Sequence, residues 1–138
     1  MRYKEQIRLR IPGAAEHVAV ARNAVDAVSE GLHLSPDARA AIKLAVGEAC
    51  DNAVRYAKRP GAPVVVIYRA GRDVLEIDVR NRGNGFHPFS PVRMPPAEAL
   101  AEHGRGLALI ELLMDDVEYL SERGNTIVRM RLARSVVH

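Results

Sequence analysis

A carboxylate and a carboxamide stand four residues apart in a segment with helical periodicity. The segment is 42–57, IKLAVGEACDNAVRYA, and the two side chains are Glu48 and Asn52. Residues four apart lie one above the other on a helix, here at the border of the apolar stripe. A carboxylate can accept a proton from a nucleophile, and an amide oxygen suits a hard divalent cation. Most pairs at this spacing are simply solvated, so the pair needs support from other signals.

Two glycine pairs supply that support. Segment 81–86, NRGNGF, directly follows an expected strand, and Gly83 and Gly85 let the backbone approach a flat ligand without a Cβ atom in the way. Segment 104–106, GRG, opens an expected helix, whose free N–H groups and dipole favour phosphate. Each pair alone is more often a turn. In this order along the chain, together with the helical Glu and Asn, they are much more specific.

Alternating segments predict the strands that position these residues. Residues 6–11, 75–80 and 126–132 alternate apolar with charged or polar side chains, residues 64–68 form a β-branched run, and 117–120 read as a further strand. Turns are expected at 71–73 and 122–125. One sheet face should pack on helices, while the other, charged face should meet water or a partner.

Three helices are expected to cover the apolar face. The first covers about 16–31 and ends at a glycine, a good C-cap residue. The second starts at Ser35, Pro36 and Asp37, which supply an N-cap, an N1 proline and an acidic first turn, and it is broken by 58–62. Its predicted apolar stripe is Ile42, Ala45, Val46, Ala49, Ala53 and Tyr56. The third helix covers roughly 106–114, with Leu107, Ile110 and Leu113 or Met114 pointing inward.

The connection 86–103 contains four prolines and shows no periodicity. Unstructured connections of this length inside a compact domain are usually functional loops or disorder. Glycines bracket this one on both sides, which predicts a hinged lid. The alternative is a disordered insertion without a role.

Composition limits the function classes. The chain has 138 residues, 48% of them hydrophobic, and a net charge of +3, as expected of one ordinary domain. The single Cys50 excludes an internal disulfide and should be packed in the core, and the five histidines show no metal-ligand spacing. No basic run marks a nucleic-acid face. No apolar run approaches the roughly 18 residues of a membrane span, and no signal peptide is visible, so we expect a cytoplasmic protein.

With these motifs the chain resembles the histidine-kinase-like (GHKL, Bergerat-fold) ATPases, and among them the small anti-sigma-factor serine/threonine kinases of bacteria. The resemblance covers nearly the whole chain. It rests on GEACDNAVRYA at 47–57, NRGNGF at 81–86 and GRGLALIELLMDDVEYLSERGNTIVRMRL at 104–132. It implies an α+β two-layer sandwich in which a mixed, mainly antiparallel sheet of about five strands packs on about three helices. The implied organisation is one ATPase domain over 1–138 with an ATP lid over roughly 86–103, and no room for a phospho-accepting histidine segment.

The resemblance also implies a role for each matched residue. Glu48 corresponds to the family's catalytic base and Asn52 to its Mg²⁺ ligand. Gly83 and Gly85 would flank the adenine of ATP. The other implied nucleotide contacts are Asn81, Gly104, Arg105, Gly106, Leu107 and Thr126. For Arg105 the open alternative is an ordinary loop arginine, and for Thr126 an ordinary strand residue.

This sequence departs from the family pattern at several positions. Asn81 stands where the first glycine box normally has Asp, whose carboxylate accepts a hydrogen bond from the adenine amino group. An amide oxygen accepts without charge, which predicts about tenfold weaker binding. Asp78 cannot substitute, because alternation points it to the opposite sheet face. Tyr56 replaces a usual histidine, and Ala108 a common glycine.

The implied function is an ATP-binding anti-sigma regulatory factor. It would be a serine/threonine-protein kinase that phosphorylates a STAS-type anti-sigma antagonist and sequesters a sigma factor, acting as a homodimer without contacting nucleic acid or membrane. The arginines of the charged sheet face provide a candidate interface, with a solvated face as the alternative; these are Arg8, Arg10, Arg80, Arg129 and Arg131. The alternative function is a non-catalytic protein-interaction module with weak or lost nucleotide binding.

Overall fold

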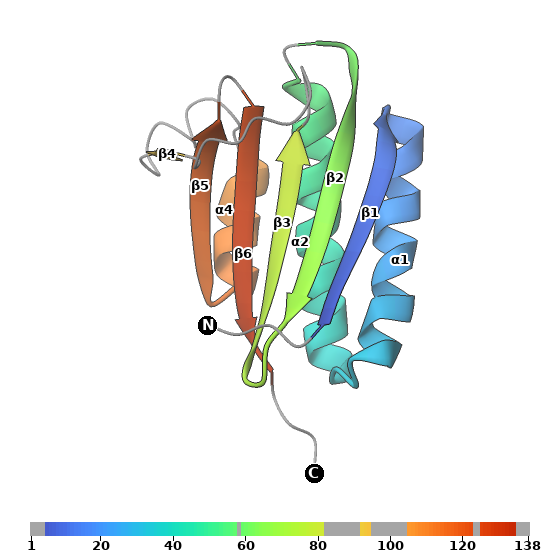
Figure 1. Ribbon diagram of the computed structural model, residues 1–138, viewed down its shortest axis with the longest axis vertical. Coiled ribbons are helices and arrows are strands. Elements are labelled where there is room, and N and C mark those ends of the chain that lie inside the picture. Colours follow the sequence, from blue (N-terminus) through green and yellow to red (C-terminus); the bar gives the residue numbers. More distant parts are fainter. Residues whose placement is uncertain (1–4, 58, 82–91, 95–104, 123–124, 135–138) are drawn as a thin grey trace.

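The computed structural model describes residues 5–57, 59–81, 92–94, 105–122 and 125–134 (Figure 1). The elements in chain order are β1 (Glu5–Gly13), the 3₁₀ turn η1 (Ala15–His17), α1 (Val18–Gly31), α2 (Pro36–Arg55), β2 (Gly61–Ala70), β3 (Val74–Asn81), β4 (Val92–Met94), α4 (Arg105–Leu113), β5 (Asp116–Glu122) and β6 (Asn125–Ala133). The strands and helices expected from periodicity are therefore all present, with ends within a few residues of their predicted places.

One six-stranded sheet contains all described strands, in the order β1-β2-β3-β6-β5-β4. Every pairing described in it is antiparallel, so the expectation of a mixed sheet is wrong in this respect. The strand absent from the prediction is β4, which pairs with β5 and lies inside the span that was expected to have no structure. It has only three residues, too few for a period-2 pattern to be visible in the sequence. The rest of the predicted lid lies outside the described residues.

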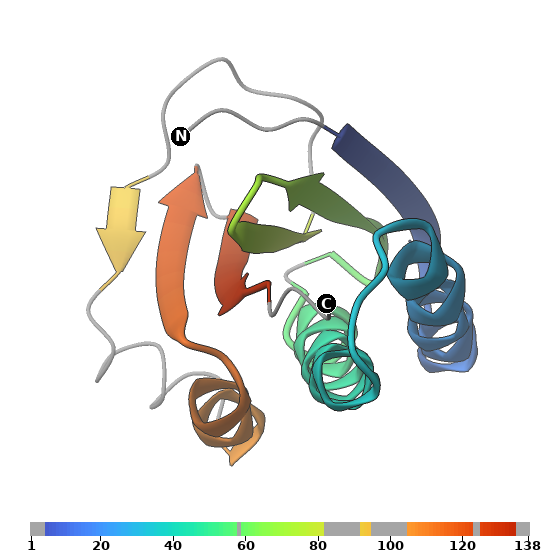
Figure 2. The same cartoon turned by 90° about the horizontal axis from the view of Figure 1, so that it is seen from below.

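The helices α1, α2 and α4 lie on one side of the sheet, which confirms the two-layer α+β architecture (Figures 1 and 2). The predicted start of α2 is also confirmed: the Oγ atom of Ser35 accepts a hydrogen bond from the N–H of Ala38 at 3.2 Å, with Pro36 in the first helical position. Among the described residues, no helix is long and apolar enough to cross a membrane.

The core fills the space between the helices and the inner face of the sheet. Along α2 the predicted stripe is buried from Ile42 to Ala53, and Cys50 packs beside it with no exposed surface. Burial raises the pKa of the Cys50 thiol to about 12, which keeps it protonated. Tyr56 contradicts the prediction, because it is 40% exposed. The helix ends at Arg55, and Tyr56 has already left helical geometry, so the stripe stops one turn earlier than expected.

The outer face of the sheet carries buried charge, contrary to the expectation that it meets water. Asp78, in the middle of β3, has no exposed surface. Its Oδ1 accepts from Nε of Arg129 at 2.8 Å, and its Oδ2 accepts from Nη1 of Arg69 at 3.0 Å and from Nη2 of Arg80 at 3.1 Å. Burial alone would raise the pKa of Asp78, but the arginine hydrogen bonds and charges outweigh it and hold that pKa below its ordinary value.

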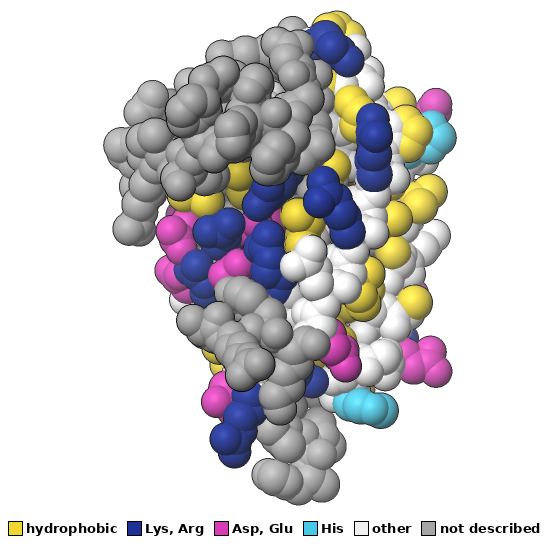
Figure 3. Space-filling model, viewed as in Figure 1, with side chains coloured by type: hydrophobic (Ala, Val, Ile, Leu, Met, Phe, Trp, Pro, Cys, Tyr) yellow, Lys and Arg dark blue, Asp and Glu magenta, His cyan; other side chains and the backbone are white. Residues whose placement is uncertain are grey.

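Glu76, two residues earlier on the same face, extends the network. It is 4% exposed, and its carboxylate accepts from Nη1 of Arg69 at 3.0 Å and from Nε of Arg131 at 2.9 Å. Arg131 also pairs with Asp116 and Glu118 on β5. We call these eight residues the ion network; they are Arg69, Glu76, Asp78, Arg80, Asp116, Glu118, Arg129 and Arg131. Its basic and acidic side chains lie intermixed on the outer face (Figure 3).

The strand register explains why these charges are buried. It sets Asp78 opposite Arg129 and Glu76 opposite Arg131 across β3 and β6, and Arg69 opposite Glu76 across β2 and β3. Opposite charges that face each other across strands pair directly, and the long arginine stems cover the shorter acids. Arg80, Arg129 and Arg131 are therefore occupied with partners in the same face, and of the five predicted interface arginines only Arg8 and Arg10 are exposed.

Candidate functional site

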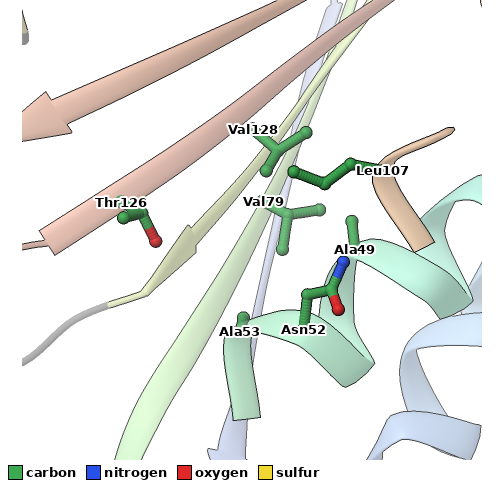
Figure 4. A pocket seen from close by; sticks show the side chains of 7 residues that line it. All are labelled: Ala49, Asn52, Ala53, Val79, Leu107, Thr126 and Val128. Atoms are coloured by element: carbon green, nitrogen blue, oxygen red, sulfur yellow. The ribbon is translucent and has the colours of Figure 1, made fainter. Parts of the chain in front are cut away.

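A small cavity opens between α2, α4 and the inner face of the sheet (Figure 4). It lies at the border of the buried face of α2, where helical spacing places Glu48 and Asn52. Most of its lining is aliphatic, with one amide and one hydroxyl side chain. The lining residues are Ala49, Asn52 and Ala53 on α2, Val79 on β3, Leu107 on α4, and Thr126 and Val128 on β6.

Asn52 is the polar side chain on the helical wall of the cavity. It is 6% exposed, and within the described part of the chain its Nδ2 atom is buried without a hydrogen-bond partner. Leaving a buried amide unpaired costs about 1–3 kcal/mol, so such a group calls for a functional reason. Because Nδ2 makes no hydrogen bond in the described part of the chain, turning the amide to present its oxygen to the cavity would break no hydrogen bond of Nδ2. The residue can therefore offer an oxygen ligand to a cation in the cavity.

Gly106 brings the second glycine segment against the Glu48 and Asn52 pair. A Cβ atom added to Gly106 would lie 2.9 Å from Nδ2 of Asn52, closer than real Cβ atoms approach, and 3.0 Å from Oε2 of Glu48, which is tighter than most real Cβ contacts. The two side chains predicted to do chemistry therefore meet at the first turn of α4, where free backbone N–H groups favour an anion. An alanine at this position would force the ends of these two side chains to move.

Asn81 ends β3 at the rim of the cavity and does not line it. It is 8% exposed, and its Nδ2 atom donates to the carbonyl oxygen of Ala53 on α2 at 3.3 Å. Asp78 lies on the other sheet face, as alternation predicted. Sequence reasoning missed the link between Asn81 and α2, since no local pattern reports which backbone carbonyl lies beside a strand end.

Apart from Asn81, the predicted site residues fall into two groups. The structure brings Glu48, Asn52, Gly106, Leu107 and Thr126 together around the cavity. Gly83, Gly85, Gly104 and the side chain of Arg105 lie outside the described residues. Sequence reasoning did not assign the aliphatic wall to the site, although alternation places Val79 and Val128 on the same sheet face as Asn81. In the described part of the chain no three His, Cys, Asp or Glu side chains are gathered to hold a metal.

Comparison with known proteins identifies relatives of the whole domain. The sequence profile of a family described as "Histidine kinase-like ATPase domain" matches residues 11–132. Two proteins named "Serine-protein kinase RsbW", from Bacillus mycoides (strain KBAB4) and Bacillus cereus (strain Q1), are each 33% identical over 133 residues, covering 90% of this chain and 82% of theirs.

A solved structure shares the fold. It contains the RsbU and RsbW domains of a Mycobacterium tuberculosis protein, and it superimposes with a TM-score of 0.71 at 16% sequence identity. The match covers 96% of this chain and 34% of that one, so this chain spans about a third of the larger protein's length. At this identity the likeness shows the fold alone.

Proposed function

Because the chain belongs to the histidine kinase-like ATPase domain family, we propose that it is an ATP-dependent serine/threonine-protein kinase. Its substrate is a STAS-type anti-sigma antagonist, and the protein also sequesters a sigma factor. The observation that carries the proposal is the meeting of Glu48, Asn52 and Gly106 beside a cavity in which the Asn52 amide is buried and unpaired.

The polar groups of the cavity fit the phosphate end of a magnesium nucleotide. Asn52 would hold the Mg²⁺ ion through its amide oxygen, and the ion would neutralise phosphate charge when bound. Gly104 to Gly106 and the first turn of α4 would bind the phosphates through backbone N–H groups. The aliphatic wall with Thr126, Asn81, Gly83 and Gly85 would accept the adenine.

Glu48 has the position required of a general base. It is half-buried, one turn before Asn52 on the same helix face, and its carboxylate lies at the turn proposed to hold the phosphates. A carboxylate here can accept the proton of an incoming serine or threonine hydroxyl while the γ-phosphoryl group of ATP moves to that oxygen and ADP leaves. The proton then resides on Glu48 until it passes to solvent.

The regulatory part of the proposal follows from charge. A phosphate on the antagonist adds about two negative charges, which weaken its docking against a carboxylate-bearing site. The kinase is then free to hold its sigma factor. We propose that it acts as a homodimer. The alternative, a module without nucleotide binding, rests only on the replacement of Asp by Asn81, which lies at the rim of the cavity.

Phosphate transfer to a purified STAS-domain antagonist from the source organism tests the function. With γ-labelled ATP and Mg²⁺, the wild type should label a serine or threonine of the antagonist, and Glu48→Gln should lower the rate about 10²- to 10⁴-fold. ATP affinity should change less than about threefold, since the proposed base acts in the transfer step. Glu30→Gln, an exposed position on α1, is the matched control. Full transfer by Glu48→Gln, or ATP binding without transfer by the wild type, would contradict the proposal.

A further inference from the structure

Apolar side chains face solvent on the helices that carry the site. On α4, Leu112 is 83% exposed, more than any other large hydrophobic side chain in the described part of the chain. On α2, Leu44 is 46% exposed. Apart from Arg105, Gly106 and Glu111, every residue of α4 is apolar, and a helix that is apolar nearly all round is usually buried. The outer side of α4 therefore has the composition of a surface that a partner covers.

The helical neighbours of both leucines are small or apolar as well. Within one turn of Leu112, α4 contributes Ala108 and Leu109, and within one turn of Leu44, α2 contributes Ala40, Ala41, Gly47 and Glu48. Glu48 is the one charged residue among these six neighbours. We call the following residues the apolar patch: Ala40, Ala41, Leu44, Ala108, Leu109 and Leu112. Each of them is exposed or partly exposed.

Helix packing sets the two leucines at the same level. The helices α2 and α4 contact each other and run in opposite directions (Figure 1). Gly106, in the first turn of α4, lies against the side chain of Glu48. At a rise of about 1.5 Å per residue, Leu112 lies about 9 Å beyond Gly106, and Leu44 lies about 6 Å from Glu48 in the same direction. Both sides of the apolar patch therefore start at the turn where Glu48 meets α4 and extend away from it together.

The apolar patch is continuous with the place that the acceptor hydroxyl must reach. In the proposed function the half-buried carboxylate of Glu48 takes the proton of that hydroxyl. A serine or threonine of a folded protein arrives together with the surface around it. Leu44 precedes Glu48 by one turn on α2, and Ala108 follows Gly106 by two residues on α4, so a substrate seated with its hydroxyl at Glu48 covers this end of the patch. Because the patch has no charged side chain, the surface that complements it is apolar.

We propose that the apolar patch is the docking surface for the protein substrate, and that it binds an apolar segment next to the acceptor serine or threonine. This inference rests on the proposed function, because it takes Glu48 as the base that receives the acceptor proton. Leu44 and Leu112 act in substrate selection and do not touch the reacting atoms. An acceptor hydroxyl with charged neighbours docks poorly, because those charges would lose water against the leucines without gaining a partner.

Steady-state kinetics of phosphate transfer to the purified antagonist separate docking from chemistry. At saturating ATP and Mg²⁺, Leu112→Ser and Leu44→Ser should each raise the KM for the antagonist about tenfold, as expected for the loss of one buried leucine contact. The kcat and the ATP affinity should change less than about twofold, because binding before the transfer step is what is lost. Leu112→Met keeps an apolar side chain of similar size and should keep the wild-type KM within about twofold. Ile7→Thr is the matched control, since Ile7 is 40% exposed on β1, at the other end of the sheet from β5 and α4.

The possible outcomes distinguish this inference from the function on which it rests. A wild-type KM in both serine variants would overturn the inference and leave the proposed function standing. A parallel loss of ATP affinity would also overturn it, because the leucines would then support the nucleotide site. If light scattering showed a wild-type dimer that dissociates in Leu112→Ser, the patch would belong to contact between two copies of the chain, which again contradicts the inference. Absence of transfer by the wild type would overturn the proposed function and this inference with it.

Discussion

Buried acidic groups are paired on the outer face of the sheet, whereas a buried amide on the inner face is unpaired within the described part of the chain. On the outer face, Asp78 is buried and surrounded by three arginines, and Glu76 beside it is shared by Arg69 and Arg131. On the inner face, the Asn52 amide is equally buried and unpaired within the described part of the chain. Both faces contain polar side chains that are protected from solvent, so burial alone does not identify a site.

The two faces differ in how completely their buried polar groups are paired with partners in the protein. In the centre of the ion network, Glu76 and Asp78 are each held by two or more arginines, so these two acids have little capacity left for a ligand. At the cavity, the unpaired amide of Asn52, the carboxylate of Glu48 and Gly106 meet at the N-terminus of α4. In the proposed function, these three residues bind Mg²⁺, accept a proton and bind phosphate, respectively. We therefore assign stability to the outer face and chemistry to the inner face. The predictions below test that division.

Removing the central acid of the network should have the largest effect on stability. Asp78→Ala leaves Arg69, Arg80 and Arg129 without their shared partner, which should lower the free energy of unfolding by about 3–5 kcal/mol in urea titrations. ATP affinity of the folded fraction should change less than about twofold. The matched control is Asp26→Ala, since Asp26 pairs with Lys43 and Arg39 at the surface and should lose at most about 1 kcal/mol. Equal losses in the two variants would contradict the structural role of the network.

Lowering the pH should remove part of the stabilisation that Asp78 provides. The pKa of Asp78 is lowered on folding, so the unfolded chain binds the proton more readily, and the stabilisation is present above about pH 4 and disappears as the pH falls through the lower folded value. The loss should be smaller than in Asp78→Ala, because a protonated carboxyl still fills its space. Urea midpoints from pH 7 to pH 2.5 should fall less steeply in Asp78→Asn than in the wild type. Parallel curves would mean that other carboxyls cause the acid sensitivity.

A methyl group at Gly106 should affect the inner face without weakening the fold. The new Cβ would press on the Asn52 and Glu48 side chains, so Gly106→Ala should weaken ATP binding about tenfold in calorimetry. Thermal stability should hold or rise, because alanine favours a helix over glycine by about 0.8–1 kcal/mol. Ala108→Ser, an exposed position on the same helix, should leave ATP affinity unchanged. Unchanged ATP affinity in Gly106→Ala would mean that the first turn of α4 does not contact the nucleotide.

The comparison with the smallest expected effect on stability is between two tyrosines. The hydroxyl of Tyr68, in the core, is buried without a partner among the described residues, while the hydroxyl of Tyr119 donates to Glu111 at 2.9 Å. Tyr68→Phe should be neutral or stabilise by up to about 1 kcal/mol, and Tyr119→Phe should cost about 1–2 kcal/mol. Urea denaturation measures both. A larger loss in Tyr68→Phe would mean that its hydroxyl has a partner in the native state.

Local patterns predicted the framework of the inner face. The N-cap at Ser35 and the period of α2 placed Glu48 and Asn52 correctly relative to the core, and the alternation of β3 placed Asn81 and Asp78 on opposite faces. These features depend on residues within one or two turns of each other. Asn52, Leu107 and Thr126 line one cavity because helix and strand periods fix which side chains face inward.

The features that the sequence did not reveal depend on register between distant strands. Asp78 meets Arg129 across a separation of 51 residues, and nothing in either strand alone reports that pairing. Alternation alone predicts that the charged outer face meets water or a partner. The hydrogen bond from Asn81 to the carbonyl oxygen of Ala53, 28 residues away in the chain, is likewise not visible in any local pattern. Both contacts are hydrogen bonds between residues far apart in the chain.

Calorimetric titration with ATP, with and without Mg²⁺, tests the assignment of chemistry to the inner face most directly. The account predicts micromolar ATP binding to the wild type that weakens without Mg²⁺, and a loss of that Mg²⁺ dependence in Asn52→Ala, whose melting temperature should be unchanged or higher once the unpaired amide is gone. Absence of heat at millimolar ATP in a folded protein, or an undiminished Mg²⁺ effect in Asn52→Ala, would contradict it.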